Sequence, residues 1–263
     1  MQFSEILALI QPEAEQEIIL PSGWAQGRAA FGGLTAAIAY HHASFGVSEE
    51  QHIRALTVSF VGPIEVGALT LQRTILREGK NVTQVRVELL QNSAVQLSAL
   101  LTFGRSRPSQ VQVTDTPSAH VPPLEQGPAF PKGPLLPEFA HNFDYRVSVG
   151  GLPFSNTPAR EFGGWMRFSH ESQPISIGLL LGLVDAWPPA VLPHLSQPAP
   201  ASSLTWTIEF PEPLPSSKRS DNWWQYVAYI DYAANGYGHT DAHIWDDEGN
   251  LVAISRQTIT VFA

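Results

Sequence analysis

The sequence contains no cysteine. This absence excludes a disulfide framework, a thiolate nucleophile and any metal or cluster site built on cysteine ligands. It agrees with a reducing compartment. The first residues, MQFSEILALIQPEAEQE, have no basic segment and turn acidic quickly, which disfavours a secretory signal peptide. No apolar run is long enough to span a bilayer. We therefore expect a cytoplasmic protein that does not enter a membrane.

Positive charge is scarce as well. The chain has 15 lysine and arginine residues against 24 aspartate and glutamate residues, a formal net charge of -9, and no basic cluster. This balance argues against a nucleic-acid-binding protein, because such binding depends on neutralising many phosphates. A small anionic ligand held by a few local groups is compatible with it. With 43% hydrophobic residues, the 263-residue chain can bury a substantial core, as one large domain or two small ones.

Several motifs of known chemistry are missing. No G-x-S-x-G sequence is present, which disfavours a serine hydrolase of the nucleophile-elbow type. The glycine turn GYGHT (236–240) is not a nucleotide fingerprint. His239 and His243 are four residues apart, but the pattern predicts a hairpin there and not a helix, which disfavours a metal site. We predict neither a metal nor a cofactor.

Proline gathers in one stretch. Eight of the 22 prolines fall between residues 106 and 138, a composition typical of an extended linker on a protein surface. The sequence therefore predicts an N-terminal unit (1–105), a proline-rich linker (106–140) and a C-terminal unit (141–263).

The N-terminal unit combines one helix with several strands. Gly32 and Gly33 precede a run of small and apolar residues, which predicts a helix that begins at a glycine turn. Exposed amides at such a helix start can hold an anion or an oxyanion, and tight packing of the helix on a sheet explains the glycines equally well. Alternating runs then predict an antiparallel meander with strands over 53–64, 68–79, 81–92 and 93–104.

The C-terminal unit repeats this plan. Strands are expected over 142–150, 160–170, 202–214, 223–235, 236–250 and 251–262. In the third of these, the period of two places Leu204, Trp206, Ile208 and Phe210 on one face. The pattern of 55–63 matches 203–211, and the pattern of 94–103 matches 251–260, which predicts an internal duplication of a helix plus an antiparallel sheet.

One carboxylate stands out in the C-terminal unit. The apolar run 174–194 predicts a buried helix that must end before Pro188, so Asp185 belongs in its last turn. An anion is unfavourable there because the helix dipole is negative at that end. Asp185 is therefore either an exposed end residue or a working acid or base.

The two units differ at polar positions. No aspartate or glutamate occurs between Gly27 and Ser48, so the first helix has no counterpart of Asp185. Aligning the units places Ala55 against Ser203 and Leu100 against Gln257. Ser203 could be an ordinary strand hydroxyl and Gln257 a surface residue at a strand end. The coincidence of three polar residues in one unit favours a functional site.

Six motifs follow one another along the chain: FGGLTAAIA, LREGKNVTQVRVELLQNSAVQLSALLTF, WMRFSH, LLLGLVDAW, SSLTWTIEF and EGNLVAISRQ. This ordered set resembles the acyl-CoA thioesterase II (TesB-like) family. The resemblance implies an α+β protein of two fused hot-dog folds, each a long helix wrapped by an antiparallel sheet. It also implies a hydrolase of fatty acid metabolism that cleaves acyl-CoA to free acid and CoA, and by analogy a homo-oligomer.

The family's catalytic trio falls on Asp185, Ser203 and Gln257. Serine replaces the family's usual threonine and keeps the hydroxyl, whereas Leu34 replaces the glutamine that usually follows the glycine pair. The resemblance implies that the trio positions a water, that Asp185 takes its proton, and that amides such as those of Gly33 and Leu34 stabilise the oxyanion. Direct attack by Asp185 through an anhydride is the alternative route. Two rival functions stay open, a hot-dog hydratase or dehydratase and a non-catalytic acyl-CoA-binding protein.

Overall fold

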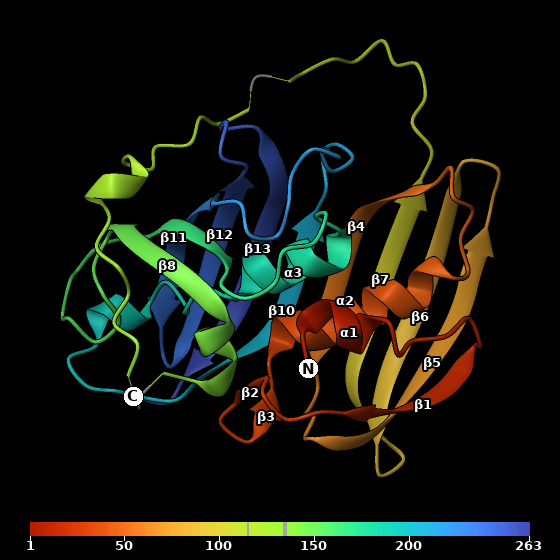
Figure 1. Cartoon of the computed structure of the whole chain (residues 1–263), viewed down its shortest axis with the longest axis horizontal. Helices are drawn as coiled ribbons and strands as arrows, with labels where there is room; N and C mark the ends of the chain where they lie inside the picture. Colours follow the sequence, from red (N-terminus) through yellow and green to blue (C-terminus); the bar gives the residue numbers. More distant parts are fainter. Residues whose placement is uncertain (115, 134–135) are drawn as a thin grey trace.

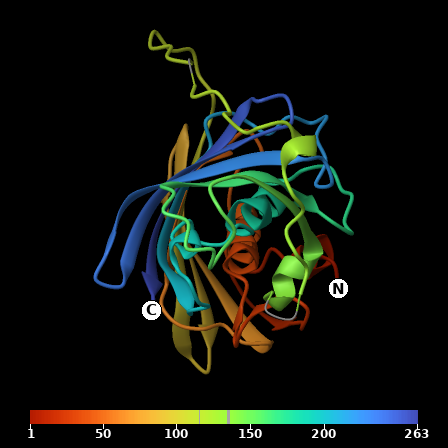
Figure 2. The same cartoon turned by 90° about the vertical axis from the view of Figure 1, so that its left-hand side faces the viewer.

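The computed structural model describes residues 1–114, 116–133 and 136–263. One curved antiparallel sheet of eleven strands surrounds two central helices, α2 (Gly32–Ser44) and α3 (Ile177–Asp185) (Figure 1, Figure 2). The strands are β1 (Glu15–Leu20), β4 (His52–Phe60), β5 (Gly67–Glu78), β6 (Val82–Gln91), β7 (Ala94–Gly104), β8 (Phe143–Val149), β9 (Glu161–Phe168), β10 (Ala201–Glu209), β11 (Trp224–Ala234), β12 (Tyr237–Trp245) and β13 (Leu251–Val261). A short helix α1 (Phe3–Leu7) and a small ribbon of β2 (Ala25–Gln26) and β3 (Ala29–Ala30) complete the first half.

The strand order is symmetric about the pair β4–β10, apart from β8, an additional strand at one edge. It runs β1-β5-β6-β7-β4-β10-β13-β12-β11-β9-β8, so the strand that follows each central helix lies at the middle of the sheet. These two strands, β4 and β10, pair antiparallel and form the seam between the halves. The sequence predicted a helix and a sheet twice, whereas the structure joins the strands of both halves into a single sheet.

The strands expected from alternation are confirmed within a few residues. Asn235 and Gly236 join two of these strands, and both residues adopt the positive φ angles, 55° and 81°, of a two-residue hairpin loop. The first helix, α1, is short and ends at Leu7, ahead of Pro12. Strand β1 was not predicted, because only Ile18 and Leu20 of its side chains are buried and the alternation is correspondingly weak.

The segment between the halves is irregular and largely exposed. From 105 to 123 its described residues form no helix or strand, and two short 3₁₀ turns follow at Leu124–Gln126 and Glu138–Asn142. The indole of Trp245 donates to the carbonyl of Pro117 (2.9 Å), and that of Trp165 donates to the carbonyl of Pro122 (2.8 Å). These two bonds attach the segment to the second half. Residues 115, 134 and 135 of the expected linker lie outside the described residues.

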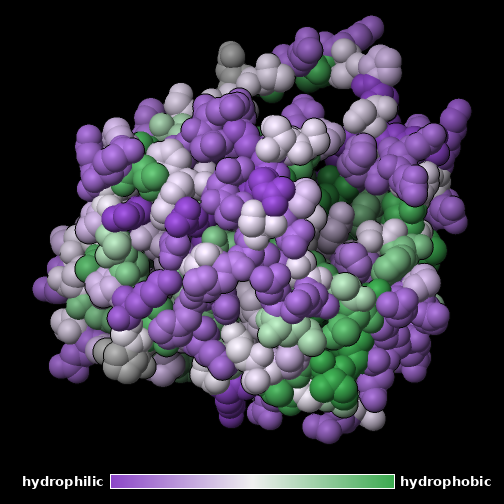
Figure 3. Space-filling model, in the orientation of Figure 1, coloured by the Kyte–Doolittle hydropathy of each residue, from purple (hydrophilic) through white to green (hydrophobic). Residues whose placement is uncertain are grey.

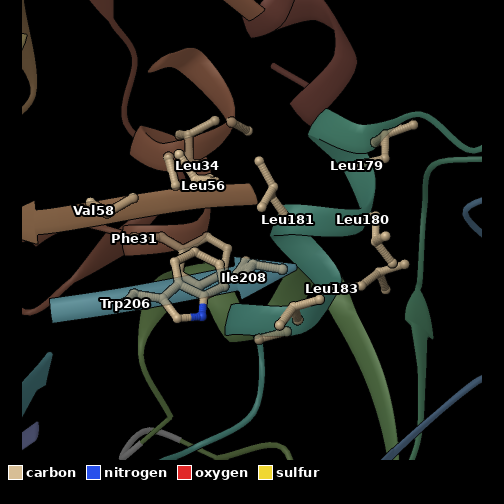
Figure 4. Packing of buried hydrophobic residues seen from close by; sticks show 14 of the residues in the cluster. Phe31, Leu34, Leu56, Val58, Leu179, Leu180, Leu181, Leu183, Trp206 and Ile208 are labelled. Carbon is tan, nitrogen blue, oxygen red and sulfur yellow. The ribbon is translucent and has the colours of Figure 1, made fainter. Parts of the chain in front are cut away.

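Helix α3 is buried on nearly all sides. Ser176 caps its first turn by accepting a hydrogen bond from the Leu179 amide (3.3 Å). Leu180, Leu181 and Leu183 are fully buried, and Figure 4 shows Leu181 directed toward Leu34 and Leu56 while Leu180 lies on the other side of the helix. Each such leucine contributes roughly 1.5 to 3 kcal/mol of hydrophobic stabilisation. None of the helices in the described part of the chain has the length and hydropathy that crossing a membrane requires.

Candidate active site

Asp185 is the last residue of α3, as the proline pair predicted. Its carboxylate is half-buried, and its Oδ1 accepts a hydrogen bond of 3.0 Å from Nε2 of Gln257. The two residues are 72 positions apart in the chain, and β13 carries Gln257 to the end of the helix. Two of the residues expected in the site are therefore in direct contact.

The start of α2 faces the same carboxylate. A β-carbon on Gly32 would lie 2.8 Å from Oδ2 of Asp185, so only glycine fits there without displacing the carboxylate. The amide of Gly33 hydrogen-bonds to Asp185. The carboxylate thus lies at the negative end of α3 and also at the positive end of α2. The dipole of α2 therefore offsets the unfavourable dipole of α3.

Burial decides the charge of this carboxylate. Desolvation raises the pKa of Asp185 to about 7, although the hydrogen bonds from Gln257 and Gly33 act in the opposite direction. A carboxylate with a pKa near neutrality can both take and release a proton at physiological pH. Asp185 therefore has the protonation behaviour of a general base or acid.

A β-bulge in β10 turns Ser203 toward this site. Ser203 pairs with Ile259 and Thr205 pairs with Thr258, which leaves Leu204 as the extra residue. Paired residues of an antiparallel sheet point to the same face, so Ser203 shares the inner face with Ile259 and Gln257. Simple alternation from Trp206 did not place Ser203 on that face, because alternation cannot anticipate the bulge.

The strand pairs also correct the alignment of the two halves. Strand β4 has a bulge at the same place, between Ile53 and Ala55, so Ile53 and not Ala55 is the counterpart of Ser203. The pair Leu56–Leu101 takes the position in the first half that the pair Trp206–Gln257 takes in the second. Leu101, and not Leu100, is therefore the counterpart of Gln257. Both true counterparts are buried apolar residues, 5% and 0% exposed. The contrast between a polar half and an apolar half therefore persists in the corrected alignment.

Ser203 and Leu34, the other two expected site residues, are placed differently. In the described residues no hydrogen bond joins the Ser203 hydroxyl to Asp185 or Gln257. The side chain of Leu34 is fully buried, and its amide donates to the carbonyl of Phe31 (3.1 Å). The structure thus brings the Gly33 amide to the carboxylate and places Ser203 on the same sheet face as Gln257. The Leu34 amide is instead used by the first turn of α2.

Aromatic side chains next to Asp185 were not expected from the sequence. The hydroxyl of Tyr145 donates to the carbonyl of Ala186 (2.9 Å), directly after the carboxylate, and the ring of Trp187 stacks on Tyr226 at 5.4 Å. Burial and then the charge of Asp185 raise the pKa of both tyrosines, so both hydroxyls stay protonated. No sequence signal marks them, since each occupies an ordinary inward position of a strand.

Among the residues that the structure describes, no three histidine, aspartate or glutamate side chains come together as metal ligands would. His239 contacts the Thr258 hydroxyl (3.3 Å), and His243 stacks on Trp245 at 5.7 Å. The histidine pair of the second half thus has other contacts.

Two family models match the chain. The model for the acyl-CoA thioesterase N-terminal domain matches residues 20–104, and the model for the acyl-CoA thioesterase C-terminal domain matches residues 115–261. A comparison with curated proteins gives no match.

Solved structures share the architecture. A conserved protein of unknown function with hot-dog fold from Alicyclobacillus acidocaldarius superposes with a TM-score of 0.87 at 22% identity, over 99% of this chain and 98% of that one. The acyl-CoA thioesterase II TesB2 of Mycobacterium marinum gives 0.78 at 21% identity, over 99% and 98% of the two chains. The tesB protein of Mycobacterium avium subs paratuberculosis gives 0.76 at 15% identity, over 100% of both. These likenesses establish the hot-dog fold.

Proposed function

This chain belongs to the acyl-CoA thioesterase family, and from that premise we propose that it hydrolyses acyl-CoA thioesters to a free acid and CoA. The observation that carries the proposal is the environment of Asp185, a carboxylate with a pKa of about 7 that is held between Gln257 and the start of α2. The family membership confirms the resemblance that the sequence motifs indicated.

In the proposed reaction Asp185 acts as the general base. A water positioned by Asp185, Gln257 and the Ser203 hydroxyl loses a proton to the carboxylate and attacks the thioester carbonyl. The carbon–sulfur bond then breaks, and CoA leaves as a thiolate that takes up a proton. Direct attack by Asp185 through an acyl anhydride is the alternative chemistry for the same residues.

The oxyanion role of Gly33 and Leu34 stays a prediction. In the structure the Gly33 amide is directed at Asp185 and the Leu34 amide at Phe31. We propose that the start of α2 mainly fixes the carboxylate, and that Gly33 reaches the carbonyl oxygen only when a substrate lies between the two helices.

We also propose that the chain arose by internal duplication. The symmetric strand order and the matching bulges of β4 and β10 support two hot-dog units, 1–105 and 141–263, joined by the linker 106–140. A fused pair of this kind is equivalent to a dimer of single units. Only the second unit carries the polar trio.

The test is free-thiol release from short, medium, long and aromatic acyl-CoAs by the wild type and by Asp185→Asn. We expect turnover on part of the panel, and a loss of at least about 100-fold in the variant. Asp231→Asn is the matched control, because Asp231 is an exposed carboxylate paired with Arg256 on the same sheet. Activity that survives in Asp185→Asn would remove the proposed base.

The same assay separates the rival functions. A non-catalytic binding protein would bind acyl-CoA without releasing thiol, and equally well with Asp185→Asn. A hydratase of this fold would need a histidine beside the carboxylate. His194, which follows Asp185 beyond the two prolines, instead has its Nε2 at 2.6 Å from the carbonyl of Ala159, so the structure offers this alternative no support.

A further inference from the structure

The inner face of strand β12 carries one polar side chain. Its inward positions are Gly238, Thr240, Ala242 and Ile244, all of them buried, and Thr240 is only 6% exposed. A polar side chain is ordinary on the outside of the molecule, where hydrophilic residues dominate the face that Figure 3 shows. A hydroxyl inside the sheet needs a hydrogen-bond partner instead.

Thr240 lies directly beside Gln257. The two residues are opposite each other in the antiparallel pairing of β12 with β13. The side chains of such a pair point to the same face of the sheet, with their β-carbons about 4.5 to 5.5 Å apart. Gln257 is the residue whose Nε2 donates to Oδ1 of Asp185 at 3.0 Å. Thr240 is therefore the neighbour of the side-chain amide that contacts the carboxylate.

Each of these two neighbours has an unused polar atom. Neither Oε1 of Gln257 nor the hydroxyl of Thr240 has a hydrogen-bond partner among the described residues. Neither atom is sealed inside the protein, in contrast to Nε1 of Trp187, which is fully buried without a partner. A water molecule can therefore reach both atoms, and one water between them accepts from the hydroxyl and donates to Oε1.

The first half has a valine in the place of Thr240. Leu101 is the counterpart of Gln257, and Leu101 pairs with Val85 on β6 as Gln257 pairs with Thr240 on β12. Val85 is fully buried. Valine and threonine have nearly the same shape, so packing at this position of the fold does not require a hydroxyl. The hydroxyl occurs in the half that carries the carboxylate and the amide.

We propose that Thr240 is a positioning residue, whose hydroxyl binds a water that donates to Oε1 of Gln257 and so keeps the amide nitrogen directed at Asp185. The reversed amide would place Oε1 against the carboxylate, where two acceptors repel each other, and would remove a hydrogen bond that favours the ionised base. The catalytic purpose of this arrangement rests on the proposed thioesterase function, because Asp185 is the base of that reaction.

Few other groups act on this carboxylate. The Gly33 amide of α2 is its second hydrogen-bond donor, and no charged side chain contributes to the shift in the pKa of Asp185. Tyr145 on β8 and Tyr226 on β11 are the titratable groups that respond to its charge, and both have raised pKa values and stay protonated near neutral pH. A substitution of Thr240 should therefore reach the carboxylate through the side-chain amide.

NMR titration of the full chain, with carbon-13 at the aspartate carboxyls, tests this without turnover, and Asp185→Asn identifies the resonance. Thr240→Val should raise the pKa of Asp185 by roughly half a pH unit or more, because the carboxylate loses an ordered donor. Thr240→Ser keeps the hydroxyl and should restore the wild-type value. Thr83→Val is the matched control, since Thr83 is a buried threonine of β6 in the first half, and it should change nothing.

A double variant shows whether the effect passes through the amide. Gln257→Leu should itself raise the pKa of Asp185, and Thr240→Val should add nothing in that background. Thiol release should follow the titration in the single variants. In Thr240→Val, kcat/KM should fall on the order of threefold at pH 6 and little at pH 9, because the acid limb of the profile moves to higher pH.

Two results would overturn the proposal. One is a pKa of Asp185 that is the same in the wild type and in Thr240→Val, whatever the activity of the protein. The other is a shift in Thr240→Val that persists undiminished in the Gln257→Leu background, which would mean that Thr240 acts by another route. An absence of thiol release by the wild type would instead refute the proposed function, while the titration still decides whether Thr240 fixes the amide.

Discussion

At the scale of single residues, the site is governed by opposing effects on one carboxylate. Two hydrogen bonds and a helix start favour the charged form of Asp185, and removal from water disfavours it. The balance leaves the pKa at about 7, well above that of an exposed aspartate. Desolvation therefore outweighs the hydrogen bonds, and it provides a base that is matched to neutral pH.

The pH dependence of catalysis follows from this balance. If Asp185 is the base, kcat/KM should fall about tenfold for each pH unit below 7 and level off above roughly pH 8, because only the deprotonated form accepts the proton. Thiol release measured between pH 5 and 9 checks this. The exposed carboxylate variant Asp231→Asn should give the same curve. A profile that is flat from pH 5.5 to 8.5 would contradict the assignment.

The same shift predicts how stability depends on pH. An unfolded aspartate ionises near pH 4, whereas folded Asp185 keeps its proton until about pH 7, so its contribution to stability falls as the pH rises between these values. Asp185→Asn should therefore be more stable than the wild type at pH 8, by about 2 kcal/mol once partial solvent access is allowed for. The advantage should vanish below pH 4. Urea unfolding at both pH values measures it, and equal stabilities at pH 8 would refute it.

The sequence could locate part of the site at this scale. Asp185 was recognisable because it interrupts an apolar run, and Gln257 because an amide stands among apolar neighbours of one strand face. Gly32 and Tyr226 were not, since their proximity to the carboxylate depends on how α2 and β11 pack and not on any local pattern.

At the scale of elements, one inserted residue decides which hydroxyl faces the site. Without the bulge, alternation from Trp206 would direct Leu204 inward. With it, Ser203 takes that position opposite Ile259. Periodicity could predict the strand but not the bulge, because the extra residue changes the phase of alternation only for the few residues at the start of β10. The strands and the helix ends were predictable for the opposite reason, since each depends on residues adjacent in the chain.

The β10 bulge leads to a prediction about kcat that a neighbouring threonine can control. Ser203→Ala should lower kcat on the order of tenfold with little change in the melting temperature, because it removes one hydroxyl from the water-binding face. Thr205→Ala removes a hydroxyl two residues away that is exposed and lies beyond the bulge, and should leave kcat unchanged. Steady-state kinetics on the best acyl-CoA of the panel compares them. Equal effects of the two variants would show that the bulge does not select the hydroxyl.

At the scale of the whole molecule, the two halves are held together by more than the chain that joins them. Strands β4 and β10 pair along the seam through five residue pairs, and α2 and α3 pack against each other between them. The site itself crosses this boundary, since Gly32 and Gly33 come from one half and Asp185 and Gln257 from the other. The sequence indicated two similar halves but not their seam, because the pairing of two distant strand edges leaves no local signal.

This arrangement predicts that the covalent linker is dispensable once the chain has folded. Residues 109–114 are exposed and belong to no helix or strand. A protease site placed there and then cut should leave acyl-CoA hydrolysis within about twofold of the uncut protein, because the seam and the helix pair keep Gly33 against Asp185. The same protein with an uncleavable version of the site, treated identically, is the control. Gel filtration should show both fragments in one peak. Separation of the fragments with loss of activity would mean that the linker, and not the continuous sheet, maintains the site.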